Sequence, residues 1–217
     1  MGHADAQNEV GWCYANGIGV TKNLSEAIIW YRKAAEQGLA QAQNRLGLCY
    51  HNGTGIAQNY SEAVGWYRKA AAQGYKNAYF NLGMCYECGF GVITNVSEAF
   101  SWYKKAADLG HDGAQNKVGI FYENGKGISR NQSEAVSWYK KSADQGNSSA
   151  QYNLGLCYEL GIGIAKDYSI SAHWYQLAAA QGHKEACEKL SVYYSKGRGV
   201  KKDTAEAKRW KEKSKKV

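Results

Sequence analysis

The sequence lacks any long hydrophobic segment. No run of apolar residues approaches the ~18 that a membrane-spanning helix needs, and the opening stretch, MGHADAQNEV, does not resemble a secretory signal. These absences argue against a membrane-inserted chain and predict a soluble protein of the cytoplasm. An ER-lumenal or exported protein is the alternative, if a targeting signal has been removed.

Net charge is also missing from most of the chain. The sequence carries 27 Lys and Arg against 19 Asp and Glu, a net charge of +8. Residues 1–188 hold 16 residues of each sign, so the whole excess lies in residues 189–217. An affinity for nucleic acid is therefore confined, if it exists, to one end of the chain.

The common signatures of catalysis and metal binding are absent. There is no G-x-S-x-G nucleophile elbow. Cys85 and Cys88 form a single C-x-x-C pair, which is weak evidence for zinc without a second pair. His3, His111 and His183 share one turn position of an internal repeat, which is typical of structural variation. We predict no enzymatic activity, no cofactor and no metal site.

The placement of the cysteines does not indicate a disulfide framework. Four of the six share one position of the internal repeat. They are Cys13, Cys49, Cys85 and Cys157. Phe121 or Tyr193 stands there in other copies, so the position accepts a buried hydrophobic side chain. We predict reduced, packed thiols in an intracellular protein.

What the sequence does contain is a repeat with a period of 36 residues. Tryptophan recurs at this interval, and the first five copies are each followed by tyrosine. The tryptophans are Trp30, Trp66, Trp102, Trp138, Trp174 and Trp210. A period of this size predicts a single array of stacked all-α units, an α-solenoid, because one such unit cannot bury its apolar face alone. The predicted boundaries are 1–5 for the end of a preceding partial repeat, then repeats at 6–41, 42–77, 78–113, 114–149, 150–185, and a divergent C-terminal capping repeat at 186–217.

Each unit is predicted to be a pair of antiparallel helices, which we call helix A and helix B. Helix A carries A-x-x-x-[LV]-G-x-x-Y, as in Ala42, Leu46 and Gly47. A glycine inside a helix costs ~1 kcal/mol relative to alanine, so its recurrence predicts a close approach of helix B. A G-x-G turn then follows, and an Asn or Asp with Glu three residues later predicts a capping box for helix B, as in Asn59 and Glu62. The basic pair after Trp-Tyr predicts a solvated face.

These motifs resemble the Sel1-like repeat (SLR) family, a relative of the tetratricopeptide repeat, over essentially the whole chain. The second half of the family pattern, A-x-x-W-Y-x-K-A-A-x-x-G, is matched by Ala99, Trp102, Tyr103, Lys105, Ala106, Ala107 and Gly110. The resemblance implies paired helices in a right-handed superhelix, and scaffolds or adaptors that hold partner proteins without one characteristic reaction. Secreted cysteine-rich members pair two cysteines within each repeat, and that pattern is absent here.

Function in a helical solenoid is expected on the concave surface lined by helix A. One helix A position is apolar in every copy: Trp12, Leu48, Met84, Ile120, Leu156 and Val192. Asn and Glu flank it, a combination that suits an extended or helical peptide. The alternative is that this apolar ladder packs successive A helices together. The predicted partner-binding residues are Asn44, Leu48, His51, Phe80, Met84, Glu87, Asn116, Ile120, Glu123, Tyr152, Leu156 and Glu159.

The alternative function is binding of nucleic acid or an anionic surface by the basic last repeat. The residues concerned are Lys196, Arg198, Lys201, Lys202, Lys208, Arg209, Lys211, Lys213, Lys215 and Lys216. A terminal repeat also needs a polar outer face, and this requirement explains the same residues. No aromatic platform for stacking bases is evident among them. We therefore favour a protein or peptide partner over nucleic acid.

Overall fold

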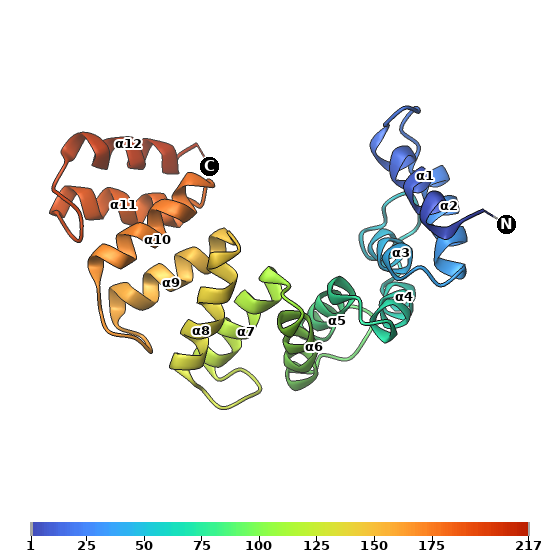
Figure 1. The fold of residues 1–217 in the computed structure, drawn as a ribbon, viewed down its shortest axis with the longest axis horizontal. Coiled ribbons are helices and arrows are strands. Elements are labelled where there is room, and N and C mark those ends of the chain that lie inside the picture. Colours follow the sequence, from blue (N-terminus) through green and yellow to red (C-terminus); the bar gives the residue numbers. More distant parts are fainter. Residues whose placement is uncertain (1, 217) are drawn as a thin grey trace. The chain divides into compact units, whose positions relative to one another are not determined.

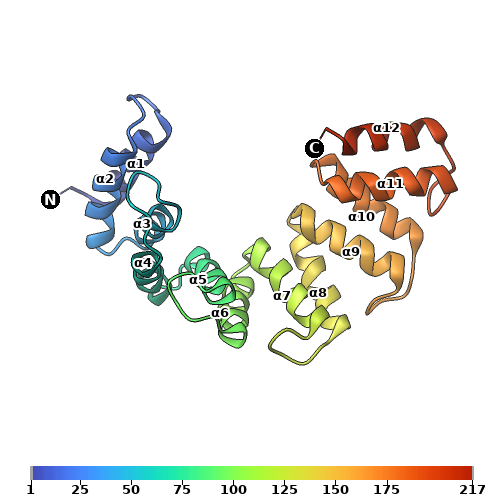
Figure 2. The same ribbon diagram turned by 180° about the vertical axis from the view of Figure 1, so that it is seen from behind.

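The computed structural model describes residues 2–216, and over this range it contains α-helices and no strand. Each helix A lies beside the helix B that follows it, in both views (Figures 1 and 2). The chain divides into two compact units, Met1–Leu109 and Gly110–Val217. The A helices are α1 (Ala4–Asn16), α3 (Ala40–Asn52), α5 (Lys76–Cys88), α7 (Asp112–Asn124), α9 (Ser148–Leu160) and α11 (Lys184–Lys196). The B helices are α2 (Leu24–Glu36), α4 (Tyr60–Ala72), α6 (Val96–Asp108), α8 (Gln132–Asp144), α10 (Tyr168–Ala180) and α12 (Thr204–Ser214).

The predicted all-α fold of repeated helix pairs is confirmed. The first unit contains α1–α6 and the second contains α7–α12. Within residues 2–216 no helix is long and apolar enough to cross a bilayer. The core of the first unit is built from small and aromatic side chains such as Ala63, Tyr67 and Leu82, and that of the second from Tyr139, Leu154 and their neighbours.

The predicted Asn or Asp is the N-cap residue immediately before each helix B. The side chain of Asn59 accepts a hydrogen bond of 3.1 Å from the backbone N–H of Glu62, and the same contact recurs in the other five copies. The reciprocal half of a capping box is not used, because the backbone N–H of Asn59 donates to the carbonyl oxygen of Tyr50. This explains why Ile170 can replace the glutamate of the fifth copy without loss of the cap.

The glycine in the middle of helix A makes room for the tyrosine of the Trp-Tyr pair. A Cβ atom on Gly47 would lie 2.6 Å from Cε1 of Tyr67, and the other four such glycines meet their tyrosine ring at 2.6 or 2.7 Å. The predicted close approach of helix B is confirmed, and a packed ring is its main cause. In the last repeat Ser191 replaces the glycine and Lys211 replaces the tyrosine. The two changes belong together, because without the ring the glycine is not needed.

The second glycine of the G-x-G turn lies against the preceding repeat. Gly91 has φ +70°, and a Cβ atom there would lie 2.4 Å from the carbonyl oxygen of Tyr60 at the start of α4. Gly163 approaches Gln132 of α8 in the same way in the second unit. Both the positive φ and the backbone contact exclude a side chain, so the glycines are explained by folding.

The basic pair after Trp-Tyr is exposed in the second and fourth repeats, as predicted, and half-buried at Arg32 and Lys104. The pair also makes specific contacts. Nζ of Lys69 lies 4.1 Å from the ring centroid of Trp66, a cation–π contact. The neighbouring Arg68 donates a hydrogen bond of 3.0 Å to the hydroxyl of Tyr86 on the next helix A. The pair therefore helps to join successive repeats within the first unit.

The cysteines are free thiols, as predicted. Cys85 and Cys157 are buried and Cys49 is half-buried, whereas Cys88 is exposed one turn after Cys85 on α5. Burial raises the pKa of the Cys49 thiol to about 11 and that of Cys85 to about 12. These thiols therefore behave as small packed hydrophobic groups.

Candidate partner-binding surface

The apolar position of helix A is partly packed and partly exposed. Leu48 in the first unit and Ile120 and Leu156 in the second touch the core of their own unit while retaining some exposure. Met84 is also half-buried. At the first and last helix A the position is open, with Trp12 39% exposed and Val192 42% exposed. Each unit therefore presents apolar surface on its A helices.

The predicted asparagines are already hydrogen-bonded to asparagines of the next repeat. Asn44 is buried and accepts a hydrogen bond of 2.8 Å from Nδ2 of Asn81. In the second unit Asn116 accepts one of 3.0 Å from Asn153. These two pairs join consecutive A helices, so they hold the spacing of the surface on which a partner would lie.

The predicted glutamates face helix B. The hydroxyl of Tyr103 donates to Glu87 at 2.8 Å, and Tyr175 donates to Glu159 at 2.6 Å. Tyr139 and Glu123 form the equivalent pair. Burial, together with the neighbouring carboxylate, raises the pKa of each of these tyrosines well above its ordinary value. The glutamates thus satisfy a hydroxyl that the fold buries.

Glu159 also forms ion pairs with two cations. It is 8% exposed, and besides Tyr175 it has Nζ of Lys189 at 2.8 Å and Nη1 of Arg198 at 3.7 Å. Lys189 comes from the helix A of the next repeat, α11. The carboxylate therefore links two repeats of the second unit through a partly buried ion pair.

His51 occupies the glutamate position of the second repeat. Its ring packs edge-on against Tyr60 and Phe90, with centroids 5.1 and 5.0 Å away. Burial lowers the pKa of His51 below its ordinary value. Nδ1 of His51 and the hydroxyl of Tyr67 are both buried without a hydrogen-bond partner among the described residues. This repeat therefore lacks the Tyr–Glu hydrogen bond.

The predicted set contains two aromatic residues, Phe80 on α5 of the first unit and Tyr152 on α9 of the second. Phe80 is half-buried with its ring centroid 5.5 Å from that of Tyr103. Tyr152 is half-buried and stacks on His183 at 4.6 Å. Burial raises the pKa of Tyr152. Both rings combine internal packing with remaining exposure.

Two hollows open on the A helices, one in each unit. The hollow of the first unit has a volume of about 330 Å³ and the hollow of the second about 310 Å³. The first is lined by Trp12, Ala15, Tyr31, Arg45, Leu48, Cys49, Asn52 and Thr54. The second is lined by Tyr152, Glu159, Glu185, Glu188, Lys189, Val192 and Tyr193.

The two hollows also contain Arg45 and Lys189, which are not among the residues predicted from the sequence. They occupy the same helix A position, which varies in charge from copy to copy: Glu9, Arg45, Asn81, Lys117, Asn153 and Lys189. That variation is the signal that comparison of the copies offers. In both hollows this residue lies beside the apolar position.

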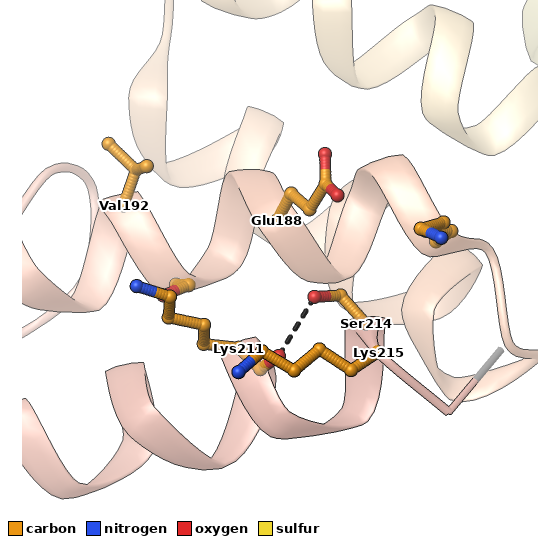
Figure 3. Close-up of a pocket in the computed structure, with 7 residues that line it drawn as sticks. Glu188, Val192, Lys211, Ser214 and Lys215 are labelled. Carbon is orange, nitrogen blue, oxygen red and sulfur yellow. Dashed lines mark hydrogen bonds between the residues drawn. The ribbon is translucent and has the colours of Figure 1, made fainter.

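A third hollow lies in the last repeat, where Lys211 and Ser191 replace the tyrosine and glycine (Figure 3). Its volume is about 400 Å³. Lys184, Glu188, Val192, Ser214 and Lys215 complete its lining. Ser214 is held by a hydrogen bond of 2.9 Å from its hydroxyl to the carbonyl oxygen of Lys211.

Comparison with protein families matches these repeats directly. The Sel1 repeat matches the chain six times, at residues 4–39, 40–75, 76–111, 113–147, 148–183 and 184–215. The chain belongs to the Sel1 repeat family. The predicted resemblance is therefore confirmed. Sel1 repeat proteins are generally helical scaffolds for protein interactions.

Solved Sel1 repeat proteins share this fold. A Sel1 repeat protein from Oxalobacter formigenes is 39% identical, with a TM-score of 0.88 over 98% of this chain and 85% of that one. A protective antigen of uropathogenic Escherichia coli strains that displays an SLR fold is 39% identical, with a TM-score of 0.92 over 99% of this chain and 46% of that one. An immunity protein from Pseudomonas aeruginosa, 22% identical with a TM-score of 0.62 over 98% of this chain and 81% of that one, shares the fold alone. Comparison with curated proteins returned no match.

Proposed function

We propose that this Sel1 repeat protein is a non-enzymatic scaffold that binds an extended or helical segment of a partner protein on its A helices. The observation that carries the proposal is the apolar position that keeps exposed surface in each unit, next to a hollow lined by both apolar and polar side chains. Apolar anchors in shallow pockets with polar neighbours are typical of peptide recognition.

The predicted residues divide into two roles under this proposal. Leu48, Met84, Ile120 and Leu156 retain exposed surface and would contact the partner. Buried Asn44 and Glu159, with the other Asn and Glu positions, would keep the A helices in register through the hydrogen bonds described above. The cytoplasm is the compartment that we propose, because buried thiols without disulfides suit a reducing environment.

Site-specific photo-crosslinking tests the surface. A diazirine amino acid is placed at Leu48 in the first unit and at Leu156 in the second, and partners are crosslinked in cells and identified by mass spectrometry. Gly65 and Ser137 are the matched controls, because they lie exposed on helices B of the same units, and a side chain at Gly65 meets nothing within 4 Å. We expect one protein to be enriched at the helix A positions. Equal or stronger crosslinking from Gly65 and Ser137 would refute the proposal.

The basic last repeat carries a second candidate function, binding of nucleic acid or another polyanion. The observation that favours it is the hollow that Lys184, Lys211 and Lys215 line. Part of the basic cluster already contacts other residues of the chain. Nζ of Lys213 donates a hydrogen bond of 2.7 Å to the carbonyl oxygen of Ala179, and Arg209 forms an ion pair with Glu206. Titration of oligonucleotides across salt concentrations tests it, because phosphate contacts must weaken steeply with salt. Absent or salt-insensitive binding would remove this candidate.

A further inference from the structure

The hollow of the first unit contains a positive charge without a counter-charge. Arg45 lines it from α3 beside Leu48, and Trp12 and Ala15 line it from α1. The guanidinium carbon of Arg45 lies 5.6 Å from the ring centroid of buried Tyr31. Nη1 of Arg45 is buried and has no hydrogen-bond partner among residues 2–216. The guanidinium also interacts electrostatically with the side chain of Tyr31, but that neutral phenol carries no counter-charge, and Nη1 has no hydrogen bond to replace its lost hydration.

The equivalent position in the second unit has the carboxylate partner that Arg45 lacks. Lys189 stands 30 residues after Glu159 and pairs with its carboxylate at 2.8 Å. Arg45 stands at the same interval after Ala15, whose methyl group cannot supply a carboxylate. Ala15 and Arg45 line one hollow, as Glu159 and Lys189 line the other. The chain thus neutralises this cation in the second unit and leaves it unneutralised in the first.

No carboxylate of the described residues takes the place of Glu159. Glu9 is exposed on α1 and affects Tyr31 electrostatically, but it accepts a hydrogen bond from Asn8 and forms no ion pair with Arg45. A partly buried guanidinium favours a carboxylate that can accept two parallel hydrogen bonds. Trp12 and Leu48 meanwhile supply an apolar wall next to the charge.

We propose that this hollow binds an acidic side chain, Asp or Glu, of the partner segment, with a neighbouring apolar residue of that segment packed on Trp12 and Leu48. The inference rests on the proposed function and adds the chemistry of the partner. A carboxylate is the ligand that this hollow suits best, because a glutamate fills the equivalent place in the second unit. Arg45 is its recognition residue, and Trp12 supplies specificity for the apolar neighbour.

Selection from a display library of random short peptides on the immobilised full chain tests the inference. Peptides that bind are synthesised, and their dissociation constants are measured by fluorescence polarisation, each beside a copy in which the acidic residue is changed to its amide. The protein variants are Arg45→Gln and Ala15→Glu. The latter places a carboxylate beside Arg45 as Glu159 is placed beside Lys189. Ala15→Gln has nearly the same size without charge, and Gly65→Glu adds the same charge on the outer face of α4.

We expect the selected peptides to be enriched in Asp or Glu next to an apolar residue. Arg45→Gln, Ala15→Glu and the amide form of the peptide should each weaken binding about tenfold or more, the effect of losing one charge-assisted contact. Ala15→Gln should weaken it far less, and Gly65→Glu should leave it unchanged. Thermal melts followed by circular dichroism confirm that every variant is folded, and Ala15→Glu should melt at a higher temperature than Ala15→Gln.

Two results would overturn the inference and they are distinguishable. Peptides that bind the A helices without an acidic preference, or with equal affinity for wild type and Ala15→Glu, refute the carboxylate site and leave the scaffold function intact. If no selected peptide binds to the A helices, both the scaffold proposal and the carboxylate site are refuted.

Discussion

The hydroxyl of Tyr175 donates a hydrogen bond of 2.6 Å to Glu159, across the two helices of one repeat. The same carboxylate pairs with Lys189 of the next repeat. A residue that sequence reasoning assigned to partner binding thus satisfies a buried hydroxyl and a partly buried cation. Its polar neighbours can still contribute to recognition, but Glu159 itself is part of the framework.

Glu159→Gln should therefore destabilise the second unit. The amide keeps the shape but removes the negative charge shared by Lys189 and Arg198, and we expect a loss of about 2 kcal/mol in the free energy of unfolding. Urea unfolding followed by circular dichroism measures it. Glu134→Gln, at an exposed position of α8, is the control and should change stability by less than about 0.5 kcal/mol. Equal stability of both variants would show that the ion pair contributes nothing.

Gly47 and Gly65 provide a matched pair in the first unit. Gly47→Ala places a methyl group 2.6 Å from the ring of Tyr67, so we expect destabilisation of about 2 kcal/mol or more. Gly65→Ala lies at an exposed position of α4 where a methyl group meets nothing within 4 Å, and it should stabilise by about 0.5–1 kcal/mol. Thermal melts should shift in opposite directions. A shift of the same sign in both variants would contradict the packing account of Gly47.

His51→Glu should stabilise the second repeat at neutral pH. The change restores the acceptor that Glu87, Glu123 and Glu159 offer their tyrosines, and the buried hydroxyl of Tyr67 now lacks a partner. We expect a gain of about 1 kcal/mol, measured by urea unfolding. His51→Leu separates this effect from simple removal of the imidazole, since it provides no acceptor. A gain in the leucine variant as large as in the glutamate variant would argue against the hydrogen bond.

Stability should fall as the pH is lowered through the titration of histidine. Burial lowers the pKa values of His51 and His183 below the ordinary value of 6.5. The unfolded chain then binds protons more readily than the folded protein. These histidines therefore leave the free energy of unfolding unchanged well above pH 6.5 and lower it progressively as the pH falls below that value. Unfolding measured from about pH 7.5 down to about pH 5 should show this loss in wild type and a smaller loss in His51→Gln. An identical pH dependence would exclude His51 as a contributor.

The cysteines should differ in reactivity according to burial. Iodoacetamide at mildly alkaline pH should alkylate exposed Cys88 and leave Cys85 and Cys157 unmodified in the native protein, because burial raises the pKa of each of these two thiols to about 12. Peptide mapping by mass spectrometry identifies the modified sites, and denatured protein serves as the positive control. Native alkylation of Cys85 at the rate of Cys88 would contradict its packed position.

The sequence by itself determined the helix pairs, because their signals are local. A cap, a turn glycine and a helical apolar stripe each act within a few residues, and their recurrence at one interval identified the Sel1 repeats. Gly47 was recognised as a place of close approach for the same reason. Its partner, the ring of Tyr67, became known only when the two helices were packed.

Only the tertiary structure decided what faces each helix A side chain. Glu159 contacts Tyr175 and Lys189, which lie 16 and 30 residues later in the sequence on neighbouring helices. Arg45 and Ala15, also 30 residues apart, line the same hollow. Such contacts depend on the rotation and offset of packed helices, which a periodic pattern does not specify. The charge left unpaired at Arg45 follows from this packing, because a cation lacks a partner only in relation to the residue that stands opposite it.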